Sequence, residues 1–483
     1  MRREDVRNAL LLALLAALVR FPTLGHQSFE HDEAITVSLI VHPSLVDTVR
    51  AVGGETSPPL FYVLEWLMSK LFGSGEVAMR SVSALAGTLT GPVVYELGRA
   101  TISRRVGLVA GALIAVSPVL VWYSQDARPY ALLVFLGALS LLCLVRAVES
   151  GTRFWLAAWA LACAAAFASH WFAGFLIAPE AAWLLLRRRG SRDARWAVAG
   201  TAAATVVLLP LLIHQSAHGG ADWIATIDLG YRIREAGEEF VSGNDPRSVH
   251  PVPLLAALVV AAALALLALR ADEHERRGGL FGLGIGLAAC VLPLAFSLAG
   301  RDFLIAKNLL VALAPLTLGV AAGLGARRAG LPGLALAAVL FCLSLGVVVA
   351  VSRDSTLQRW DARGAARAMG RPTGERAVVV PYNQDIGLAI YLADWKPAGP
   401  SPRVDEVVVL GRYDPDRLRA PSGFRRVETR RLTAFEMTRF RAALPLRVSR
   451  RRLATTDLGG GCTPSSTVSG CEQGSVLLER PSG

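Results

Sequence analysis

Long apolar segments separated by short polar connectors dominate the sequence. A run of about 18 or more apolar residues is long enough to cross a bilayer as an α-helix, so the pattern predicts an α-helical polytopic membrane protein. The first run, Asn8–Leu24, has no small-residue cleavage site after it and is expected to be a retained helix, not a signal peptide. We expect about eleven transmembrane helices, at 8–25, 77–98, 107–124, 130–148, 153–169, 172–187, 196–213, 252–270, 280–299, 308–326 and 331–352.

The charges of the connectors predict which side of the membrane each one occupies. Lys and Arg near helix ends tend to stay on the cytoplasmic side. The N-terminal MRREDVR is taken as cytoplasmic. The connectors on the same side are then those at 99–105, 149–153, 187–195, 270–277 and 326–328. The strongly basic connectors thus share one side, and the tail from Arg353 lies outside.

This alternation requires that residues 58–73, PPLFYVLEWLMSKLFG, do not cross the membrane. The segment is short for a span and contains Glu65 and Lys70. Its apolar residues suit a helix that lies in the outer interface. If it did cross, every later connector would change sides. We therefore expect an outer loop at 26–76 that carries interfacial helices.

The tail has a different pattern. ERAVVVPY (375–382) and DEVVVLG (405–411) are typical of buried strands, and DIGLAIYLA (385–393) is typical of a helix between them. The chain is therefore expected to have a transmembrane domain at 1–352 and a small soluble extracytoplasmic α/β domain at 353–483.

Composition agrees with a membrane protein and limits its partners. Hydrophobic residues make up 53% of the 483 residues and charged residues 18%, whereas soluble proteins carry about 25% charge. The net charge is +12, and the tail from Arg353 holds 22 basic and 14 acidic residues, a net of +8. This excess is diffuse, so attraction to anionic membrane lipid or plain solubility explains it better than nucleic acid, which is not expected as a partner.

The six cysteines fall into two groups. Two of them, Cys462 and Cys471 in GGGCTPSSTVSGCEQG, could close a small disulfide in an oxidising compartment or remain unpaired thiols. The others lie in apolar runs and are expected to be packing residues: Cys143, Cys163, Cys290 and Cys342.

Polar residues suited to chemistry fall in the connectors assigned to the outer side. A carboxylate at a membrane boundary costs free energy unless it is paired or serves a function. We therefore expect these residues to share one site. They are Asp32 and Glu33 in FEHDEAI, Asp126, Arg128 and Tyr130 in YSQDARPY, His170 with Trp171, and Lys307 with Asn308.

These residue types fit the transfer of a sugar from a lipid-linked donor. The isoprenoid tail stays in the membrane, while the phosphate and the sugar reach the interface. A carboxylate can take the proton of an acceptor hydroxyl as the oxygen attacks the anomeric carbon. The departing lipid phosphate is already a stable anion, so it needs positive charge or hydrogen-bond donors and no general acid. A single displacement of this kind inverts the anomeric centre.

Three motifs resemble the C-type-fold membrane glycosyltransferases of the protein O-mannosyltransferase and lipid A aminoarabinose transferase group, which are family 39-like. HDE (31–33) is similar to the acidic pair of that family. TSPPLFYVLEWLMSKLFGSGEVAMRSVSALAG (56–87) resembles the segment that follows the pair. SPVLVWYSQDARPYALL (117–133) resembles the second outer loop, which has an acid, a small residue and then Arg-Pro-Tyr.

The segment 56–87 also matches the family at its entry into the next span. The family pattern there is G-x-x-E-x-x-x-R, and this chain has Gly73, Glu76 and Arg80. The similarity extends over residues 5–350, so the resemblance implies the C-type glycosyltransferase fold for the membrane domain.

The resemblance implies a role for each motif residue. Asp32 would be the general base, and Glu33 would orient the acceptor or a metal ion. Asp126 would be a second carboxylate at the site. Arg128 and Tyr130 would support their loop or face the donor phosphate.

The cation near the later span departs from the family pattern. Relatives often carry Arg-Tyr before a Pro-containing span, whereas this chain has Lys307 and Asn308, with Pro315 further on. Lys is a point charge where Arg would bind in a bidentate manner. Arg301 is the alternative phosphate clamp. Two histidines are further site candidates: His170, and His31, which precedes Asp32 in the sequence.

Each assignment has an ordinary structural alternative. Asp32 and Glu33 could cap a helix that begins at Ala34. Asp126 and Arg128 could form a surface ion pair. The remaining alternatives are an interfacial anchor for Tyr130, a helix-end position for Lys307 and simple packing for His170.

No cofactor is expected to be obligatory. A divalent metal ion is an option because carboxylates and imidazole are plausible ligands. The candidate ligands, Asp32, Glu33, Asp126 and His31, do not have the spacing of a metal motif.

The sequence therefore predicts a hexosyl- or pentosyltransferase that uses a polyprenyl-phosphate sugar as donor. The acceptor stays open among lipid, polysaccharide and protein hydroxyls. A transporter or flippase of lipid-linked sugars is the alternative; it would need polar groups near the midplane and often has repeated halves. A polymer-binding scaffold that displays residues 353–483 is a further alternative. The Arg- and Ala-rich composition suggests a bacterial source, and hence a plasma membrane.

Overall fold

The computed structural model describes residues 2–217, 219, 222–243, 251–381, 383–432, 435–455 and 474–481 of the chain. Contacts among them define two compact units. The helical unit contains Met1–Leu24 and Leu39–Ala350, and the sheet unit contains Gly25–Ser38 and Val351–Gly483. Residues 25–38, which the sequence assigned to the transmembrane domain, thus group with the tail.

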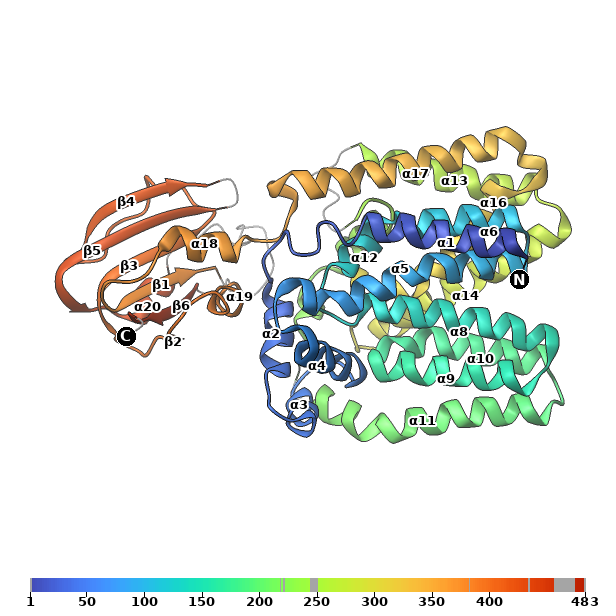
Figure 1. Cartoon of the computed structure of the whole chain (residues 1–483), viewed down its shortest axis with the longest axis horizontal. Helices are drawn as coiled ribbons and strands as arrows, with labels where there is room; N and C mark the ends of the chain where they lie inside the picture. Colours follow the sequence, from blue (N-terminus) through green and yellow to red (C-terminus); the bar gives the residue numbers. More distant parts are fainter. Residues whose placement is uncertain are drawn as a thin grey trace. The chain divides into compact units, whose positions relative to one another are not determined.

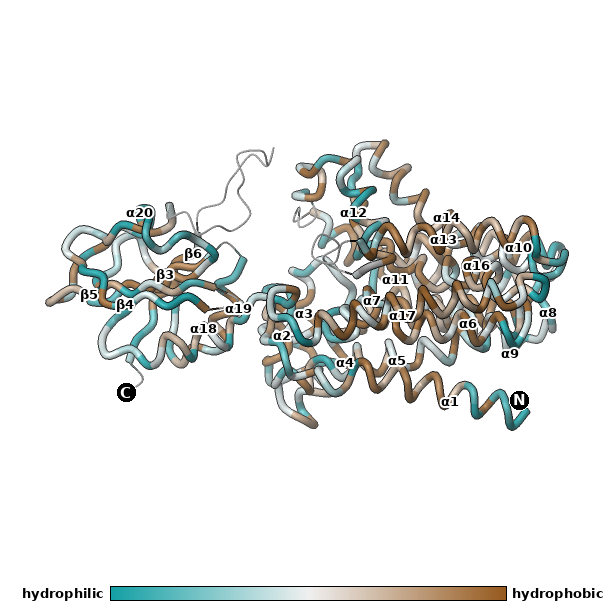
Figure 2. The backbone as a smooth tube through the Cα atoms, turned by 90° about the horizontal axis from the view of Figure 1, so that it is seen from above, coloured by the Kyte–Doolittle hydropathy of each residue, from teal (hydrophilic) through white to brown (hydrophobic). Residues whose placement is uncertain are grey.

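The helical unit is a bundle of long helices that run alongside one another (Figure 1). The helices are hydrophobic through their middle parts and more hydrophilic near the connectors, as Figure 2 shows. The bundle consists of α1 (Arg3–Leu18), α5 (Glu76–Thr101), α6 (Arg104–Ala115), α7 (Pro118–Ser124), α8 (Tyr130–Ser150), α9 (Arg153–Ser169), α10 (Gly174–Arg187), α11 (Arg192–Ser216), α13 (Val252–Leu269), α14 (Glu273–Leu298), α16 (Leu313–Gly325) and α17 (Gly330–Arg353).

Shorter helices lie between these. The predicted interfacial segment at 58–73 contains α4 (Leu60–Phe72), and α3 (Leu45–Val52) precedes it; both lie at the end of the bundle opposite the N-terminus (Figure 1). The others are α12 (Leu229–Ser242), α15 (Ala306–Leu309) and the 3-10 helices η1 (Trp171–Ala173), η2 (Asp222–Thr226), η4 (Leu310–Ala312) and η5 (Arg327–Ala329).

The prediction of a multi-pass membrane protein is confirmed, whereas the count of eleven spans is not. Among the described residues, seven helices are long and apolar enough to cross a membrane, and the bent pair α6–α7 would make an eighth. A helix occupies each of the eleven predicted segments. However, α1 and α10 have only 16 and 14 residues, and α9 is also short.

The span predicted at 107–124 is broken into two helices. α6 and α7 meet at an angle of 54°. Pro118 begins α7, and the preceding Ser117 has a non-helical ψ of 117°. A residue before proline is disfavoured in the α conformation, so the helix cannot continue through this point.

The connectors assigned to the cytoplasmic side gather at one end of the bundle. Arginine side chains form hydrogen bonds between neighbouring connectors. If the connectors alternate between the two sides of the membrane, those assigned to one side must lie at the same end of the bundle. The contacts are Arg104 Nε to Asp5 Oδ1 (2.9 Å), Arg146 to Glu96, Arg188 Nη2 to the Ala147 carbonyl (3.3 Å), Arg153 Nε to Asp193 Oδ2 (3.0 Å) and Arg105 Nη2 to the Gly330 carbonyl (2.6 Å).

The cysteines in the apolar runs are unpaired. Cys143 and Cys163 are buried, as a packing role predicts, and Cys290 is partly buried. Cys342 is exposed on α17, so it does not fill the core of the bundle. Cys462 and Cys471 lie outside the described residues.

The sheet unit is built on a six-stranded mixed sheet with the order β2-β6-β1-β3-β5-β4. β1 (Arg376–Val380) and β3 (Arg403–Gly411) are parallel, and the other neighbours are antiparallel. This confirms the small C-terminal α/β fold. The other elements are η6 (Ser355–Leu357), α18 (Ala362–Met369), α19 (Asp385–Ala389), β2 (Trp395–Pro397), β4 (Arg425–Arg431), β5 (Glu436–Arg447), α20 (Arg450–Ala454) and β6 (Ser475–Glu479).

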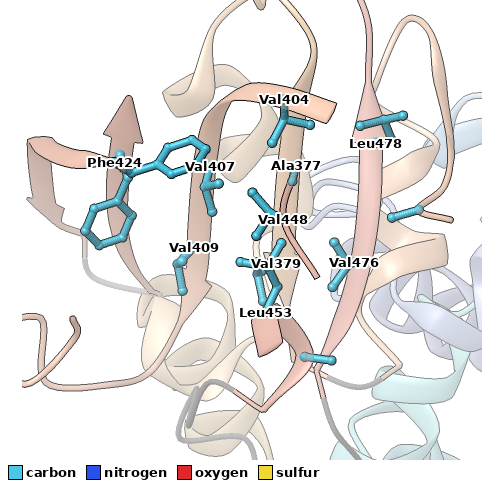
Figure 3. Close-up of a cluster of buried hydrophobic side chains, with 13 residues drawn as sticks. Ala377, Val379, Val404, Val407, Val409, Phe424, Val448, Leu453, Val476 and Leu478 are labelled. Carbon is cyan, nitrogen blue, oxygen red and sulfur yellow. The ribbon is translucent and has the colours of Figure 1, made fainter. Parts of the chain in front are cut away.

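Both faces of the central strands are covered, which explains their continuous apolar sequences. Ala377 and Val379 of β1 belong to one cluster, which includes Leu453 of α20 (Figure 3). Val378 and Val380 point to the opposite face, because successive strand residues alternate. There they pack in a second cluster with Met369 of α18 and Leu388 of α19.

A buried carboxylate on β3 links three strands. Glu406 accepts hydrogen bonds from Arg439 Nη1 and Arg441 Nε, both at 2.8 Å, and from Arg376 Nη1 at 3.3 Å. Arg376 also pairs with Glu479 Oε2 on β6 at 2.7 Å. Arg439 also pairs with Glu428 of β4, so three acids face three arginines and the network links the central strands.

We expect Glu406→Ala to destabilise the sheet unit by about 3 kcal/mol, because buried arginines lose their shared partner. This value is at the low end of the cost of breaking a buried ion pair, about 3 to 5 kcal/mol. In the variant, Arg376 still pairs with Glu479, and Arg439 still pairs with Glu428. Hydrogen exchange of the β1 and β3 amides in the full-length protein measures this change. Asp416→Ala, which removes an exposed pair with Arg431, should cost less than about 1 kcal/mol. Equal effects of the two variants would refute the buried network.

Candidate functional site

The acidic motif HDE (31–33) forms the first turn of a helix whose residues up to Ser38 belong to the sheet unit. α2 (His31–Ile40) begins at His31, and the Ala34 N–H donates to the Glu30 carbonyl at 2.9 Å. The helix therefore starts three residues before the predicted Ala34. Asp32 lies inside the first turn, so it is not the N-cap that the structural alternative required.

The two adjacent acids have different surroundings. Glu33 is fully buried, and its Oε2 accepts the backbone N–H of Glu30 at 3.1 Å. This is half of a capping box, so the capping alternative holds for Glu33. Asp32 is half-buried in the first turn, next to His31, which is also half-buried. Asp32 is thus the more accessible carboxylate of the pair.

In the helical unit, Arg128 and Asp126 are buried just before α8. They are 5% and 2% exposed, which excludes the surface ion pair considered above. Arg128 Nη2 lies 3.6 Å from Glu55 Oε2, and Arg128 Nη1 donates to the Tyr62 hydroxyl at 3.3 Å. The Ser83 hydroxyl donates to the Arg128 carbonyl at 3.0 Å. α4 and α5 therefore fix this arginine from two sides.

A second cation lies close to the aromatic residue that follows Arg128. Lys307 Nζ is 5.8 Å from the centre of the Tyr130 ring and 6.0 Å from the centre of the Trp223 ring. The Tyr130 and His170 rings are 5.4 Å apart, centre to centre. Tyr130 is buried, so it is not a lipid-facing interfacial anchor. The structure thus brings together three residues from three connectors.

His170 is held as a neutral hydrogen-bond donor. Its Nδ1 accepts the Phe172 N–H at 3.3 Å, which leaves Nε2 to carry the proton of the neutral ring. Burial, together with the nearby charges of Arg128 and Lys307, lowers the pKa of His170 from 6.5 to about 3. The ring is therefore uncharged at neutral pH and can donate to an anion without adding charge.

A buried ion pair holds the segment that leads to Lys307. Arg232 of α12 binds both oxygens of Asp302, at 2.7 and 2.6 Å, and donates to the Leu304 carbonyl at 2.9 Å. Its Nε donates to the Ile227 carbonyl at 2.9 Å. The contact with Arg232 holds the pKa of Asp302 below its ordinary value. Arg301, the alternative clamp, is exposed beside this pair.

The predicted site residues thus occur in two groups. Arg128, Tyr130, His170 and Lys307 cluster in the helical unit, and His31, Asp32 and Glu33 share one helical turn. Sequence reasoning missed Glu55, Tyr62 and Arg232. Glu55 lies directly before the TSPPLFY motif, which was a usable signal, whereas Arg232 lies in a polar helix without any motif.

The described residues contain no group of three or more His, Cys, Asp or Glu side chains placed to hold a metal ion. The carboxylates considered as ligands are divided, with Asp32 and Glu33 in the sheet unit and Asp126 in the helical unit. Metal binding by them stays a prediction.

Comparison with known proteins agrees with the motifs. Residues 56–214 match the family model described as dolichyl-phosphate-mannose-protein mannosyltransferase. The matched region contains the TSPPLFY segment and the DARPY loop. ArnT from Cupriavidus metallidurans in the apo state is 14% identical, with a TM-score of 0.54, and the match covers 89% of this chain and 97% of ArnT. The chain therefore has the C-type fold of the membrane glycosyltransferases.

Other comparisons give a consistent picture. The structure of the same ArnT bound to undecaprenyl phosphate is 12% identical, with a TM-score of 0.53 and the same coverage. An oligosaccharyltransferase from Archaeoglobus fulgidus is 13% identical, but its TM-score of 0.44 is too low to add weight; the match covers 77% of this chain and 58% of that one. No curated protein sequence matches this chain.

We expect acidification to destabilise the protein through His170. The pKa of the ring is about 3 in the folded protein and ordinary in the unfolded chain. Between these values the unfolded chain binds more protons, so stability falls as the pH falls. From pH 7 to pH 5 the wild type should lose about 2 kcal/mol more than His170→Asn.

Denaturant unfolding of the purified protein in detergent at the two pH values measures this difference. The asparagine side chain can still accept the Phe172 N–H. His26→Asn, at an exposed position, is the control and should behave as the wild type does. A loss of stability that is the same in the wild type and His170→Asn would contradict the assignment.

Proposed function

We propose that this protein transfers a sugar from a polyprenyl-phosphate donor to an acceptor hydroxyl at the outer face of the membrane. The match of residues 56–214 to the mannosyltransferase family model carries this proposal. The ArnT structure with undecaprenyl phosphate supports the donor class, since that protein shares the fold. The acceptor is a lipid, a polysaccharide or a protein hydroxyl.

The reaction is a single displacement with inversion. The acceptor oxygen forms a bond to the anomeric carbon, and the bond from that carbon to the phosphate oxygen breaks. Asp32 takes the proton of the acceptor hydroxyl as general base. The other product is polyprenyl phosphate, which leaves as an anion. Asp32 suits the role because it is half-buried in the first turn of α2, whereas Glu33 is enclosed and engaged by the backbone.

The cationic cluster of the helical unit would bind the donor phosphate. Arg128 and Lys307 supply positive charge, which is partly balanced by Glu55. Tyr130 lies beside Lys307, and the neutral ring of His170 can add a hydrogen bond. Arg301 is an alternative cation, and Asp126 a second carboxylate near Arg128. If a divalent ion takes part, Asp32, Glu33 and Asp126 would be its ligands, with His31 beside them.

We expect Asp32→Asn to lower sugar transfer by about 10²- to 10⁴-fold, because the amide cannot accept the hydroxyl proton. Binding of the polyprenyl donor should persist. The measurement is release of polyprenyl phosphate from a panel of polyprenyl-phosphate sugars by purified protein. Asp47→Asn removes an exposed acid on α3 and should leave transfer unchanged.

Undiminished transfer by Asp32→Asn would exclude this carboxylate as the base. The same assay separates the transporter or flippase alternative. A flippase moves the lipid-linked sugar across the bilayer and releases no polyprenyl phosphate, so release by the wild type favours the transferase.

We further propose a plasma-membrane location with a cytoplasmic N-terminus and an extracytoplasmic tail. In a cysteine-free background, Thr56→Cys and Ser150→Cys place single thiols at exposed positions in connectors assigned to opposite sides. A membrane-impermeant maleimide should label position 56 in intact cells and position 150 only after lysis. The reverse result would invert the topology and place Asp32 in the cytoplasm.

A further inference from the structure

Residues 25–29, which precede the acidic motif HDE (31–33), form hydrogen bonds with residues more than 330 positions later in the sequence. The Phe29 N–H donates to the Tyr391 hydroxyl at 2.8 Å. Arg363 Nη2 donates to the carbonyls of Gly25 and His26, at 3.2 and 2.7 Å. All these residues belong to the sheet unit.

Ser28 both donates and accepts a hydrogen bond in this contact. Its hydroxyl donates to the Trp360 carbonyl at 3.0 Å and accepts the Ala362 N–H at 2.9 Å. The Arg359 N–H donates to Gln27 Oε1 at 3.0 Å. The partner residues 359–363 run into the start of α18, so they are themselves fixed to the sheet.

These contacts engage the backbone where α2 begins. Phe29 and Ser28 are buried, and a buried N–H group without an acceptor is costly. The Phe29 and Tyr391 rings lie 6.5 Å apart, and a Cβ on Gly387 of α19 would be 3.4 Å from the Phe29 carbonyl. The path of residues 28–30 is therefore determined by the sheet unit, and Asp32 follows two residues later.

We propose that residues of the sheet unit fix the position of the acidic motif HDE (31–33). Tyr391, Ser28 and Arg363 hold the first turn of α2, so the Asp32 carboxylate meets the acceptor in a fixed orientation. This inference rests on the proposed function, in which Asp32 is the general base. None of the three side chains touches a reacting atom. Tyr391 and Arg363 bind the backbone of residues 25–29, and Ser28 binds the backbone of residues 360–362.

The test compares Tyr391→Phe with Tyr413→Phe in the full-length protein. Tyr413 is a matched control because its hydroxyl likewise forms a hydrogen bond with a backbone group of the sheet unit, here as the donor to the Val409 carbonyl at 3.0 Å. Arg363→Gln is compared in the same way with Arg417→Gln, an exposed arginine paired with Asp414. Ser28→Ala provides a third change on the other side of the contact.

The first readout is hydrogen exchange of peptides that contain residues 28–34, which requires no activity. Tyr391→Phe should speed exchange there about tenfold, since the Phe29 N–H loses its acceptor. The β1 and β3 amides should stay protected, which reports an intact sheet. The second readout is steady-state transfer, in which kcat should fall about 10- to 100-fold while KM for the donor stays within about twofold.

The outcomes are separable. Faster exchange with a lower kcat in Tyr391→Phe, Ser28→Ala and Arg363→Gln, and in neither control, supports positioning. Unchanged exchange overturns it, and so does faster exchange with full transfer activity. If the wild type releases no polyprenyl phosphate from any donor while exchange still rises, the proposed function fails and the fastening of α2 stands.

Discussion

The cost of burying charge in apolar surroundings governs where the ionisable residues of this protein lie. Within the helical unit, Arg146 and Glu96 pair where α5 and α8 end. Arg128 enters the apolar interior with Glu55 and Tyr62 as partners. The anion-binding chemistry proposed here uses ionisable groups that are held by partners of this kind. The same constraint makes each partner of a buried charge as necessary as the charge itself.

This constraint also explains what sequence could predict. A helix that crosses the membrane must be apolar along its length, and each predicted span contains a helix of the bundle. The break at Ser117–Pro118 was visible as a proline, but the continuous apolar run concealed it. The motifs predicted Arg128 and Tyr130 as site residues, and the structure places both in buried positions, with Tyr130 beside Lys307 and His170. The two strands and the intervening helix of the tail were also predicted from local sequence.

Partner choice could not be predicted, because it depends on contacts between distant segments. Glu55 lies 73 residues before Arg128 in the sequence, yet its carboxylate is 3.6 Å from the Arg128 guanidinium. Arg232 and Asp302 are 70 residues apart, and neither belongs to a motif. The grouping of residues 25–38 with the tail depends on backbone hydrogen bonds to Tyr391 and Arg363, which leave no periodic pattern in the sequence.

Asp32 and Glu33 are adjacent acids, but the fold gives them different roles. The proposed transfer to a hydroxyl needs one general base, because the lipid phosphate leaves without protonation. Here Glu33 turns inward and closes the first turn of α2 by accepting the Glu30 N–H. That hydrogen bond stabilises the first turn of α2, which contains Asp32. The buried Glu33 therefore helps to fix the position of the more accessible Asp32.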